Sequence, residues 1–309
     1  MEQPKNGVLL VNIGTPKSTD PEDVKVFLKA FLSDKRVIKS NSLVWKMVLN
    51  GLVLRRRPPR AAKRYEAIWT DAGSPILVYA KAQKAHLQGL MPDTIVEIGM
   101  SYSEPTIAEG LEKLIAKGVT KLTVIPLFPQ YSGTTVGSIF DATCDYFVKT
   151  DKVVDIRFAT SYHTQPDYIA YFAGKIKTYT DFDAVLFSYH NIPKAYAEAG
   201  DRYPHECAET TRLIMEQVGE MPHFQCFQST FGHDEWLSPK TDETLKVLPE
   251  KGIKKLLVVA PGFLADNLET LLEIGVEGRK LFMEAGGEEF VYLPTFNDDP
   301  ALAGILKNL

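Results

Sequence analysis

Residues 7–16 of the chain are GVLLVNIGTP, an apolar run that ends in a polar turn with a single glycine. The run has no polar alternate, which is typical of a strand covered on both faces of a parallel sheet. An amphipathic segment follows at 21–32, with Asp20 as candidate N-cap and Pro21 at the first helical position. This stretch therefore predicts a strand, a turn and a helix, the opening unit of an α/β protein.

The same alternation continues along the chain. Alternating strands and helices predict an α/β fold, which we expect to form two similar Rossmann-like lobes with parallel sheets flanked by helices. Apolar runs predict strands at 7–11, 94–100, 121–127, 153–158, 184–188, 224–228 and 256–260. Helix-length segments lie at 21–32, 107–117, 205–218, 241–251 and 268–285.

The strands divide between two halves of the chain. Near 161–166 the sequence changes from a strand to a new helix start. We therefore place an N-terminal α/β lobe at 1–160 and a C-terminal α/β lobe at 161–290. Residues 291–309 are expected to pack back on the first lobe.

Composition narrows the class of protein. The 309 residues are 45% hydrophobic and 24% charged, as in an ordinary globular protein, and the net charge of −4 argues against a nucleic-acid partner. Three scattered cysteines without a C-x-x-C pair fit a reducing compartment. The apolar run at 8–11 is too short for a signal peptide, and no stretch approaches the roughly 20 apolar residues of a membrane span. We expect a cytoplasmic protein.

Polar and aromatic residues follow most of the predicted strands. Ligands of open α/β sheets bind beyond the carboxyl ends of the strands, so these residues predict one active cleft lined from both lobes. The turn at 14–16 is not a G-x-G-x-x-G or phosphate loop, so nucleotide binding is not indicated. The residues concerned are 12–16, 101–102, 129–132, 189–191, 228–229 and 261–263.

His190 stands just past the buried run at 184–188. A histidine there points toward the ligand end of the sheet, and its ordinary pKa near 6.5 suits proton transfer at neutral pH. Neutral imidazole is also a ligand for borderline metals. A structural, hydrogen-bonded histidine is an equally good reading of the position alone.

Asp266, Glu269 and Glu273 are spaced by three and four residues, which predicts one acidic helical face. Packed like charges destabilise a helix unless a cation or a proton path uses them. The alternative is a solvated acidic face near a helix N-terminus, where acids are favourable. The neighbours of these carboxylates are strongly apolar, which argues against full solvation.

The segment 43–54 is apolar and runs into a basic cluster that includes Arg55, Arg56, Arg57 and Arg60. An apolar patch beside cations fits an amphiphile with anionic edge groups, or an anionic membrane surface. The alternative is a core helix followed by a solvated turn.

Taken together, these stretches resemble ferrochelatases along nearly the whole chain, and most closely those of Gram-negative bacteria that act on protoporphyrin IX. The histidine motif and the acidic motif are the most specific. The matching stretches are L-V-N-I-G-T-P at 10–16, F-L-x-x-F-L-S-D at 27–34, G-S-P at 73–75, P-Q-Y-S at 129–132, F-S-Y-H-N-I-P at 187–193, D-x-Y-P at 201–204, F-Q-S at 227–229, W-L-x-P-x-T-D-E-T at 236–244 and D-x-x-E-T-L-x-E at 266–273.

The resemblance implies a class II chelatase fold and a lyase that inserts Fe²⁺ into protoporphyrin IX, giving protohaem as the terminal step of haem biosynthesis. It implies that His190 and Glu269 are the catalytic and metal-contacting residues, opposite each other, with Asp266 and Glu273 forming a proton or metal path. The first lobe would carry the porphyrin-entry lip, with weak peripheral contact to the inner membrane. The porphyrin-binding residues implied are Ile13, Arg56, Arg57, Tyr65, Ser74, Tyr102, Tyr131, Trp236 and Phe263.

Some residues depart from the family pattern. Ile13 replaces a tyrosine or methionine of some relatives and cannot ligate a metal, and Ser101 replaces an arginine of the animal enzymes. Asn267 stands where a histidine is common. Gly133 replaces a cluster-binding cysteine, and the chain ends at Leu309 without a cysteine-rich tail, so we expect no iron–sulfur cluster and no cofactor beyond Fe²⁺ as substrate.

Two other functions compete with this interpretation. One is a chelatase of the same fold that acts on coproporphyrin III or sirohydrochlorin. The other, of a different class, is a non-catalytic two-lobed protein that binds tetrapyrroles. Such a protein would need no acidic residues opposite a histidine.

Overall fold

The computed structural model describes residues 4–40, 42–232 and 234–309. The chain forms two compact units. The first unit comprises Met1–Ser161 and Asp298–Leu309, and the second comprises Tyr162–Asn297. The return to the first unit thus begins at Asp298, rather than at the residue 291 expected from the sequence.

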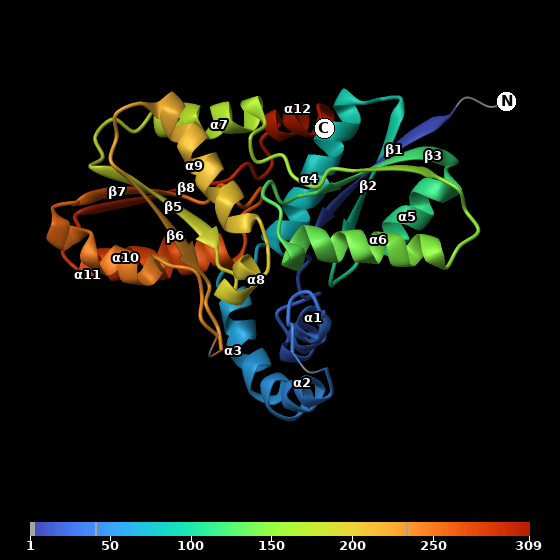
Figure 1. The fold of residues 1–309 in the computed structure, drawn as a ribbon, viewed down its shortest axis with the longest axis horizontal. Helices are drawn as coiled ribbons and strands as arrows, with labels where there is room; N and C mark the ends of the chain where they lie inside the picture. The colour runs from blue at the N-terminus through green and yellow to red at the C-terminus, as the bar shows by residue number, and fades with distance from the viewer. Residues whose placement is uncertain (1–3, 41, 233) are drawn as a thin grey trace. The chain divides into compact units, whose positions relative to one another are not determined.

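The first unit is built on a four-stranded parallel sheet of order β2-β1-β3-β4 (Figure 1). Its strands are β1 (Lys5–Asn12), β2 (Thr94–Met100), β3 (Val119–Pro126) and β4 (Asp155–Phe158). Its helices are α1 (Pro21–Ser33), α2 (Ser42–Val48), η1 (Leu49–Val53), α3 (Leu54–Glu66), α4 (Pro75–Leu90), α5 (Ile107–Ala116), η2 (Gly133–Gly137), α6 (Ser138–Val148) and α12 (Ala301–Lys307).

Local sequence explains where the early elements begin. The Asp20 side chain accepts a hydrogen bond from the Glu22 N–H, with Pro21 at the first helical position, so the predicted cap of α1 is confirmed. The buried strand β1 lies between β2 and β3, which accounts for its lack of polar alternates. The chain ends with α12, which packs on α4.

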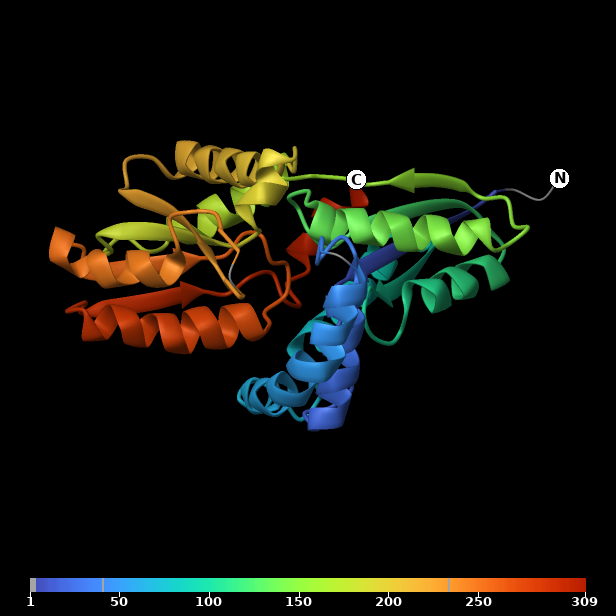
Figure 2. The same cartoon turned by 60° about the horizontal axis from the view of Figure 1, so that its bottom comes forward.

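A helical arm made of α1, α2, η1 and α3 stands off from the sheet of the first unit (Figure 2). It has its own apolar cluster, formed by α1 residues such as Phe27 and Leu28 with Leu49 and Leu54 from the following helices. Trp45 packs against this cluster and donates its indole N–H to the Leu32 carbonyl over 2.7 Å. The segment 43–54 is therefore neither wholly core nor wholly surface.

The second unit repeats the architecture with a parallel sheet of order β6-β5-β7-β8. Helices α7 and α9 cover one face, and α10 and α11 cover the other (Figure 1). The strands are β5 (Ala184–His190), β6 (His223–Gln228), β7 (Lys255–Val259) and β8 (Glu289–Leu293). The helices are α7 (Pro166–Ile176), α8 (Lys194–Glu198), α9 (Tyr203–Val218), α10 (Thr241–Val247), η3 (Pro249–Lys251), η4 (Leu268–Gly278) and α11 (Arg279–Glu284).

The two sheets confirm the predicted fold of two similar α/β lobes. In each sheet the first strand of the unit lies inside, and the chain adds strands to one side of it and then to the other. The carboxyl end of such a strand is a topological switch point, where ligands bind in this class of fold. Asn12 ends β1 and His190 ends β5, so each unit presents its own motif at this position.

Several features differ from the sequence-based expectations, among them helices α4, α6 and α7, which the expected segments omit. Strand β8 is missing from them, because it is a short edge strand that is only partly buried. The helix expected at 268–285 is a π-helix, η4, followed by α11. Among the described residues, no helix is long and apolar enough to cross a membrane.

Candidate active site in the second unit

His190 is the last residue of β5 and is half-buried. Its Nδ1 lies 2.7 Å from the carbonyl oxygen of Asn191. A carbonyl only accepts hydrogen bonds, so Nδ1 carries the proton of the neutral ring. The Nε2 atom then keeps its lone pair, which can accept a proton or bind a metal.

The loop after His190 is held by the side chain of Asn191, which is buried. Its Oδ1 accepts from the Leu237 N–H and its Nδ2 donates to the Leu237 carbonyl, both over 3.0 Å.

The adjoining residue, Trp236, is buried and packs against Phe231 at 4.9 Å between ring centroids. The Trp236 indole N–H has no hydrogen-bond partner among the described residues. An unsatisfied buried donor of this kind is uncommon in folded proteins and marks a position where a ligand could supply the acceptor.

Two glutamates of the site lie on η4. Asn267 caps this helix: its Oδ1 accepts from the backbone N–H of Glu269 at 3.0 Å and of Thr270 at 3.1 Å. The cap fixes the first turn, which carries Glu269. A π-helix has more than four residues per turn, so Glu273 follows near the same side of the helix.

Ser229, directly after β6, orients Glu273. Its backbone N–H donates to Glu273 Oε1 over 2.7 Å, and its hydroxyl donates to Oε2 over 2.6 Å. Ser229 has a φ of 68°, in the left-handed region that costs a non-glycine residue about 1–2 kcal/mol. These two bonds compensate for that strain and fix both carboxylate oxygens.

The charges of Glu269 and His190 both affect the pKa of Glu273, so the three side chains belong to one site. Burial raises the pKa of Glu273, and the charge of Glu269 raises it further, whereas the Ser229 hydrogen bonds and His190 oppose the rise. No three His, Cys, Asp or Glu side chains are placed to hold a metal ion within 4–40, 42–232 and 234–309.

Gln228 connects the histidine strand with the glutamate helix. It lies opposite His190 in the register of β6 with β5, and only 2% of its surface is exposed. Its Oε1 accepts from the Ser188 hydroxyl over 2.5 Å, and its Nε2 donates to the Glu269 carbonyl over 2.9 Å. One buried amide thus bridges β5 and η4.

Asp266 has a different setting from the glutamates. It precedes η4, so the expectation that it shares a helical face with them is wrong. Its buried carboxylate accepts from the Thr270 and Tyr292 hydroxyls, at 2.8 and 2.7 Å, and from Asn297 Nδ2 at 2.7 Å. This arrangement anchors the start of η4 to β8 and to the end of the second unit.

In the first unit, three of the predicted porphyrin-binding residues lie around the carboxyl end of β1. The Tyr102 N–H donates to the Ile13 carbonyl over 3.1 Å. Thr15 donates its hydroxyl to the buried Ser74 over 2.7 Å. The Thr15 N–H also donates to the Ser103 hydroxyl over 3.1 Å. The loop after β1, the loop after β2 and the start of α4 therefore meet at one place.

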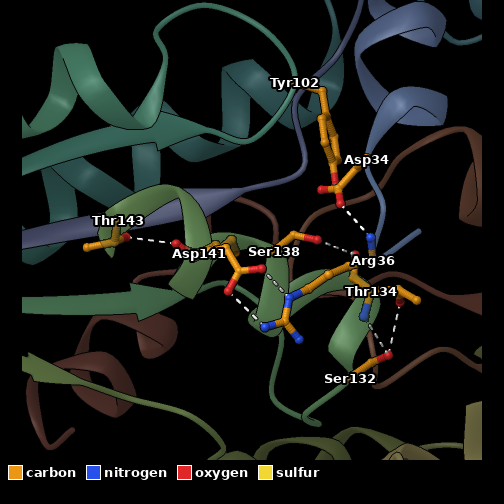
Figure 3. A network of polar contacts seen from close by, with 9 residues as sticks. Asp34, Arg36, Tyr102, Ser132, Thr134, Ser138, Asp141 and Thr143 are labelled. Atoms are coloured by element: carbon orange, nitrogen blue, oxygen red, sulfur yellow. Dashed lines mark hydrogen bonds and ion pairs between the residues drawn. The ribbon is translucent and has the colours of Figure 1, made fainter. Parts of the chain in front are cut away.

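A polar network that the sequence did not predict holds Tyr102 (Figure 3). The Tyr102 hydroxyl donates to Asp34 Oδ2, and the Arg36 N–H donates to Asp34 Oδ1, both over 2.7 Å. The Arg36 guanidinium in turn binds Asp141 of α6 through Nε and Nη2. Burial and Asp34 together raise the pKa of Tyr102, so the phenol stays protonated.

The remaining predicted residues of the first unit lie on α3 and in the loop before η2. Arg56 and Arg57 are exposed on α3. Tyr65, near the end of the same helix, packs with Tyr102 against the apolar cluster of the arm. Tyr131 is half-buried in the loop before η2. In the second unit, Phe263 is partly buried and packs against the core near β7.

The comparisons with known proteins extend over the whole chain. A family model described as Ferrochelatase matches residues 5–309. The chain is 49% identical over 308 residues to a coproporphyrin III ferrochelatase of Enterococcus faecalis, covering 99% of this chain and 98% of that protein. It is 44% identical over 315 residues to a ferrochelatase of Klebsiella pneumoniae, covering 100% and 98%.

Solved structures show the same fold at low sequence identity. SirB from Bacillus subtilis with Fe³⁺ has a TM-score of 0.60 at 16% identity, covering 98% of this chain and 93% of that one. The sirohydrochlorin chelatase SirB of Bacillus subtilis subspecies spizizenii in complex with cobalt has a TM-score of 0.55 at 15% identity, with the same coverage.

The hydrogen bonds predict different stability effects for two neighbouring carboxylates. Replacing Asp266 by Asn places an amide among three donors, and we expect it to destabilise the protein by about 1–3 kcal/mol. Glu269→Gln is the matched control, because among the described residues the Glu269 carboxylate accepts no hydrogen bond. Thermal unfolding midpoints measure the difference. Equal midpoints for the two variants would contradict the anchoring role of Asp266.

Proposed function

Because the chain belongs to the ferrochelatase family, whose members are lyases that insert metal into porphyrin, we propose that it inserts Fe²⁺ into protoporphyrin IX to give protohaem. The observation that carries the proposal is the second unit's site. It combines the imidazole of His190, whose Nε2 lone pair is available, with Glu269 and Glu273 of η4, and the pKa of Glu273 responds to the charges of both neighbours.

The chemistry requires proton acceptors and oxygen or nitrogen ligands together. Two pyrrole protons must leave the porphyrin, and ferrous iron must exchange water for pyrrole nitrogens. Neutral imidazole and carboxylate can each accept a proton and can each ligate iron. We assign His190 as the first proton acceptor and Glu269 as the second catalytic and metal-contacting group.

The neighbouring acids take different roles. Glu273 has a raised pKa and both oxygens oriented by Ser229, which suits a group that receives protons and passes them on. Asp266 was expected on the same path. Its buried contacts with Thr270 and Tyr292 favour a positioning role instead.

Porphyrin binding is proposed for residues of both units. Arginine guanidinium groups form forked hydrogen bonds to carboxylates, so Arg56 and Arg57 suit porphyrin propionates. In the second unit, the unpartnered indole N–H of Trp236 supports a ligand contact at that residue. We propose that the aromatic and apolar members of the set contact the macrocycle; these are Ile13, Tyr65, Tyr102, Tyr131, Trp236 and Phe263, with Ser74 beside the propionates.

The choice of porphyrin rests on two observations that point in different directions. Exposed apolar side chains on α2 and η1 favour protoporphyrin IX, which has fewer carboxylates than coproporphyrin III. The 49% identical relative named coproporphyrin III ferrochelatase favours the second substrate. Comparing kcat/KM for the two porphyrins under the same anaerobic conditions decides between them, and we expect the higher value for protoporphyrin IX.

We also propose that the enzyme has no iron–sulfur cluster. Cys144 is exposed on α6, whereas Cys207 on α9 and Cys226 on β6 are buried. Burial raises the pKa of both buried thiols, which disfavours the thiolates that a cluster needs. A cluster absorption band with stoichiometric sulfide in anaerobically purified protein would refute this.

Removing the imidazole tests the assignment of His190. We expect His190→Ala to lower kcat for haem formation by about 10²–10⁴, as for loss of a general base. Anaerobic assays that follow haem absorption measure this, and His223→Ala, an exposed histidine at the start of β6, is the control. If His190→Ala kept most of the wild-type turnover, the assignment of His190 as a proton acceptor would be wrong.

The raised pKa of Glu273 predicts the pH profile. As pH falls, a carboxyl with a raised pKa takes up its proton early and can no longer accept one, so activity is lost above the ordinary glutamate range near 4.3. Glu273→Gln removes the carboxyl whose early protonation sets this limb. The acid limb of kcat against pH should therefore move to lower pH.

Glu284→Gln is the matched control for this measurement, because Glu284 pairs with Lys280 on the surface of α11. Its acid limb should coincide with that of the wild type. An acid limb that stays in place in Glu273→Gln, or moves to higher pH, would contradict the assignment of this limb to Glu273.

We further propose that the arm is the entry lip for porphyrin and a peripheral membrane contact. Leu43, Met47 and Leu52 are 71%, 64% and 48% exposed, beside exposed arginines of α3. Burying apolar surface in the membrane stabilises the attachment by about 25 cal/mol per Å². Each arginine near an anionic surface adds about 1 kcal/mol to the binding free energy. Salt should weaken the attachment.

Replacing Leu43, Met47 and Leu52 with serine tests this surface. Trp45 is left intact because its indole supports the arm. We expect a higher KM for porphyrin together with weaker sedimentation with anionic vesicles. Unchanged values of both would show that these side chains form neither a lip nor a membrane contact.

A further inference from the structure

Strand β4 is the outer strand of the first sheet, and it is unusually exposed. Three of its four residues, Asp155, Ile156 and Arg157, are exposed, whereas the strand at the other edge, β2, is buried along almost its whole length. An edge with accessible backbone groups is a template for pairing with another strand. Among the described residues, no strand pairs with the outer side of β4.

The backbone register shows which groups of β4 point outward. The Ala159 N–H donates to the Val124 carbonyl over 3.0 Å, and Phe158 lies opposite Val124 in the parallel register. Backbone groups alternate along a strand, so those of Asp155 and Arg157 point toward β3. The N–H and C=O of Ile156 therefore point away from the sheet, as do those of Val154 and Phe158.

An antiparallel pairing with a second copy, centred on Ile156, matches this pattern. A two-fold axis there makes Ile156 a hydrogen-bonded pair with its counterpart, using the outward groups. Asp155 then lies opposite Arg157 of the second copy, in a non-hydrogen-bonded pair, where side chains are closest. Neither Asp155 nor Arg157 has a side-chain hydrogen bond or an ion pair among the described residues.

The other face of the strand is apolar and also self-complementary. Val154 and Phe158 pack on the core of the first unit, and Ile156, on the same side of the strand, is 40% exposed. The same axis places Val154 opposite Phe158 of the second copy. Phe140 of α6 is 48% exposed and contacts the Phe158 ring at 5.4 Å between centroids, which extends the apolar row.

From this complementarity of hydrogen bonds, charge and apolar side chains, we propose that β4 is a homodimer surface that joins the first-unit sheets of two copies edge to edge. The strand has four residues, so the interface is small. Small interfaces belong to weak, transient complexes, and the dimer therefore forms in a concentration-dependent manner.

Sedimentation equilibrium of the full chain over a wide concentration range tests the proposal. The mass should rise from 34.5 kDa toward twice that value as concentration increases. Ile156→Lys places a charge at the centre of the edge and should leave a monomer throughout. Val247→Lys is the control, because Val247 is 41% exposed on α10 of the second unit, and it should dimerise like the wild type.

Reversing the charges identifies the pairing itself. Asp155→Arg and Arg157→Asp each place like charges opposite each other and should weaken dimerisation at least about tenfold, whereas the double variant restores the pairs and should recover it. Circular dichroism checks that every variant is folded. A monomeric wild type at all concentrations, a dimer that Ile156→Lys leaves intact, or a double variant no better than the singles would overturn the proposal.

Discussion

The hydrogen bonds of Gln228 are the constraint on which the second unit's site depends. Its amide accepts from Ser188 on the histidine strand and donates to the Glu269 carbonyl on the π-helix, in a region closed to solvent. Ser188 also contacts the Thr241 hydroxyl at 2.9 Å, which ties the bridge to α10. A buried amide that loses one partner pays the full cost of desolvation, so the bridge favours a single spacing of strand and helix.

The fixed distance between β5 and η4 explains why the ligand-binding end of the sheet also carries the reactive side chains. His190 lies at the switch point of the sheet, and η4 brings its glutamates close enough that Glu273 responds to the charges of Glu269 and His190. Asp266 anchors the same helix from behind through Tyr292 and Asn297. The acidic motif thus contains two kinds of carboxylate: Glu273 responds to the charges of Glu269 and His190, whereas Asp266 is hydrogen-bonded into the fold.

Sequence alone was sufficient for the elements that depend on local pattern. The apolar runs located seven of the strands, the cap at Asp20 followed from residue type, and His190 was placed by the end of its strand. Features that depend on tertiary packing were not accessible. A π-helix has no distinct residue pattern. Ser229 combines a positive φ with hydrogen bonds to Glu273, and Asp266 faces donors that come from distant segments.

The most direct measurement is the reaction of Gln228→Met, which keeps side-chain length and removes both hydrogen bonds. The account predicts that kcat for iron insertion falls by about tenfold to a hundredfold, because a small displacement of reacting groups has effects of this size. Porphyrin affinity, measured by fluorescence quenching, should change less than about twofold, since the bridge holds the reacting groups rather than the macrocycle. A folded Gln228→Met enzyme with wild-type kcat would contradict the claim that this bridge holds His190 and Glu269 in place.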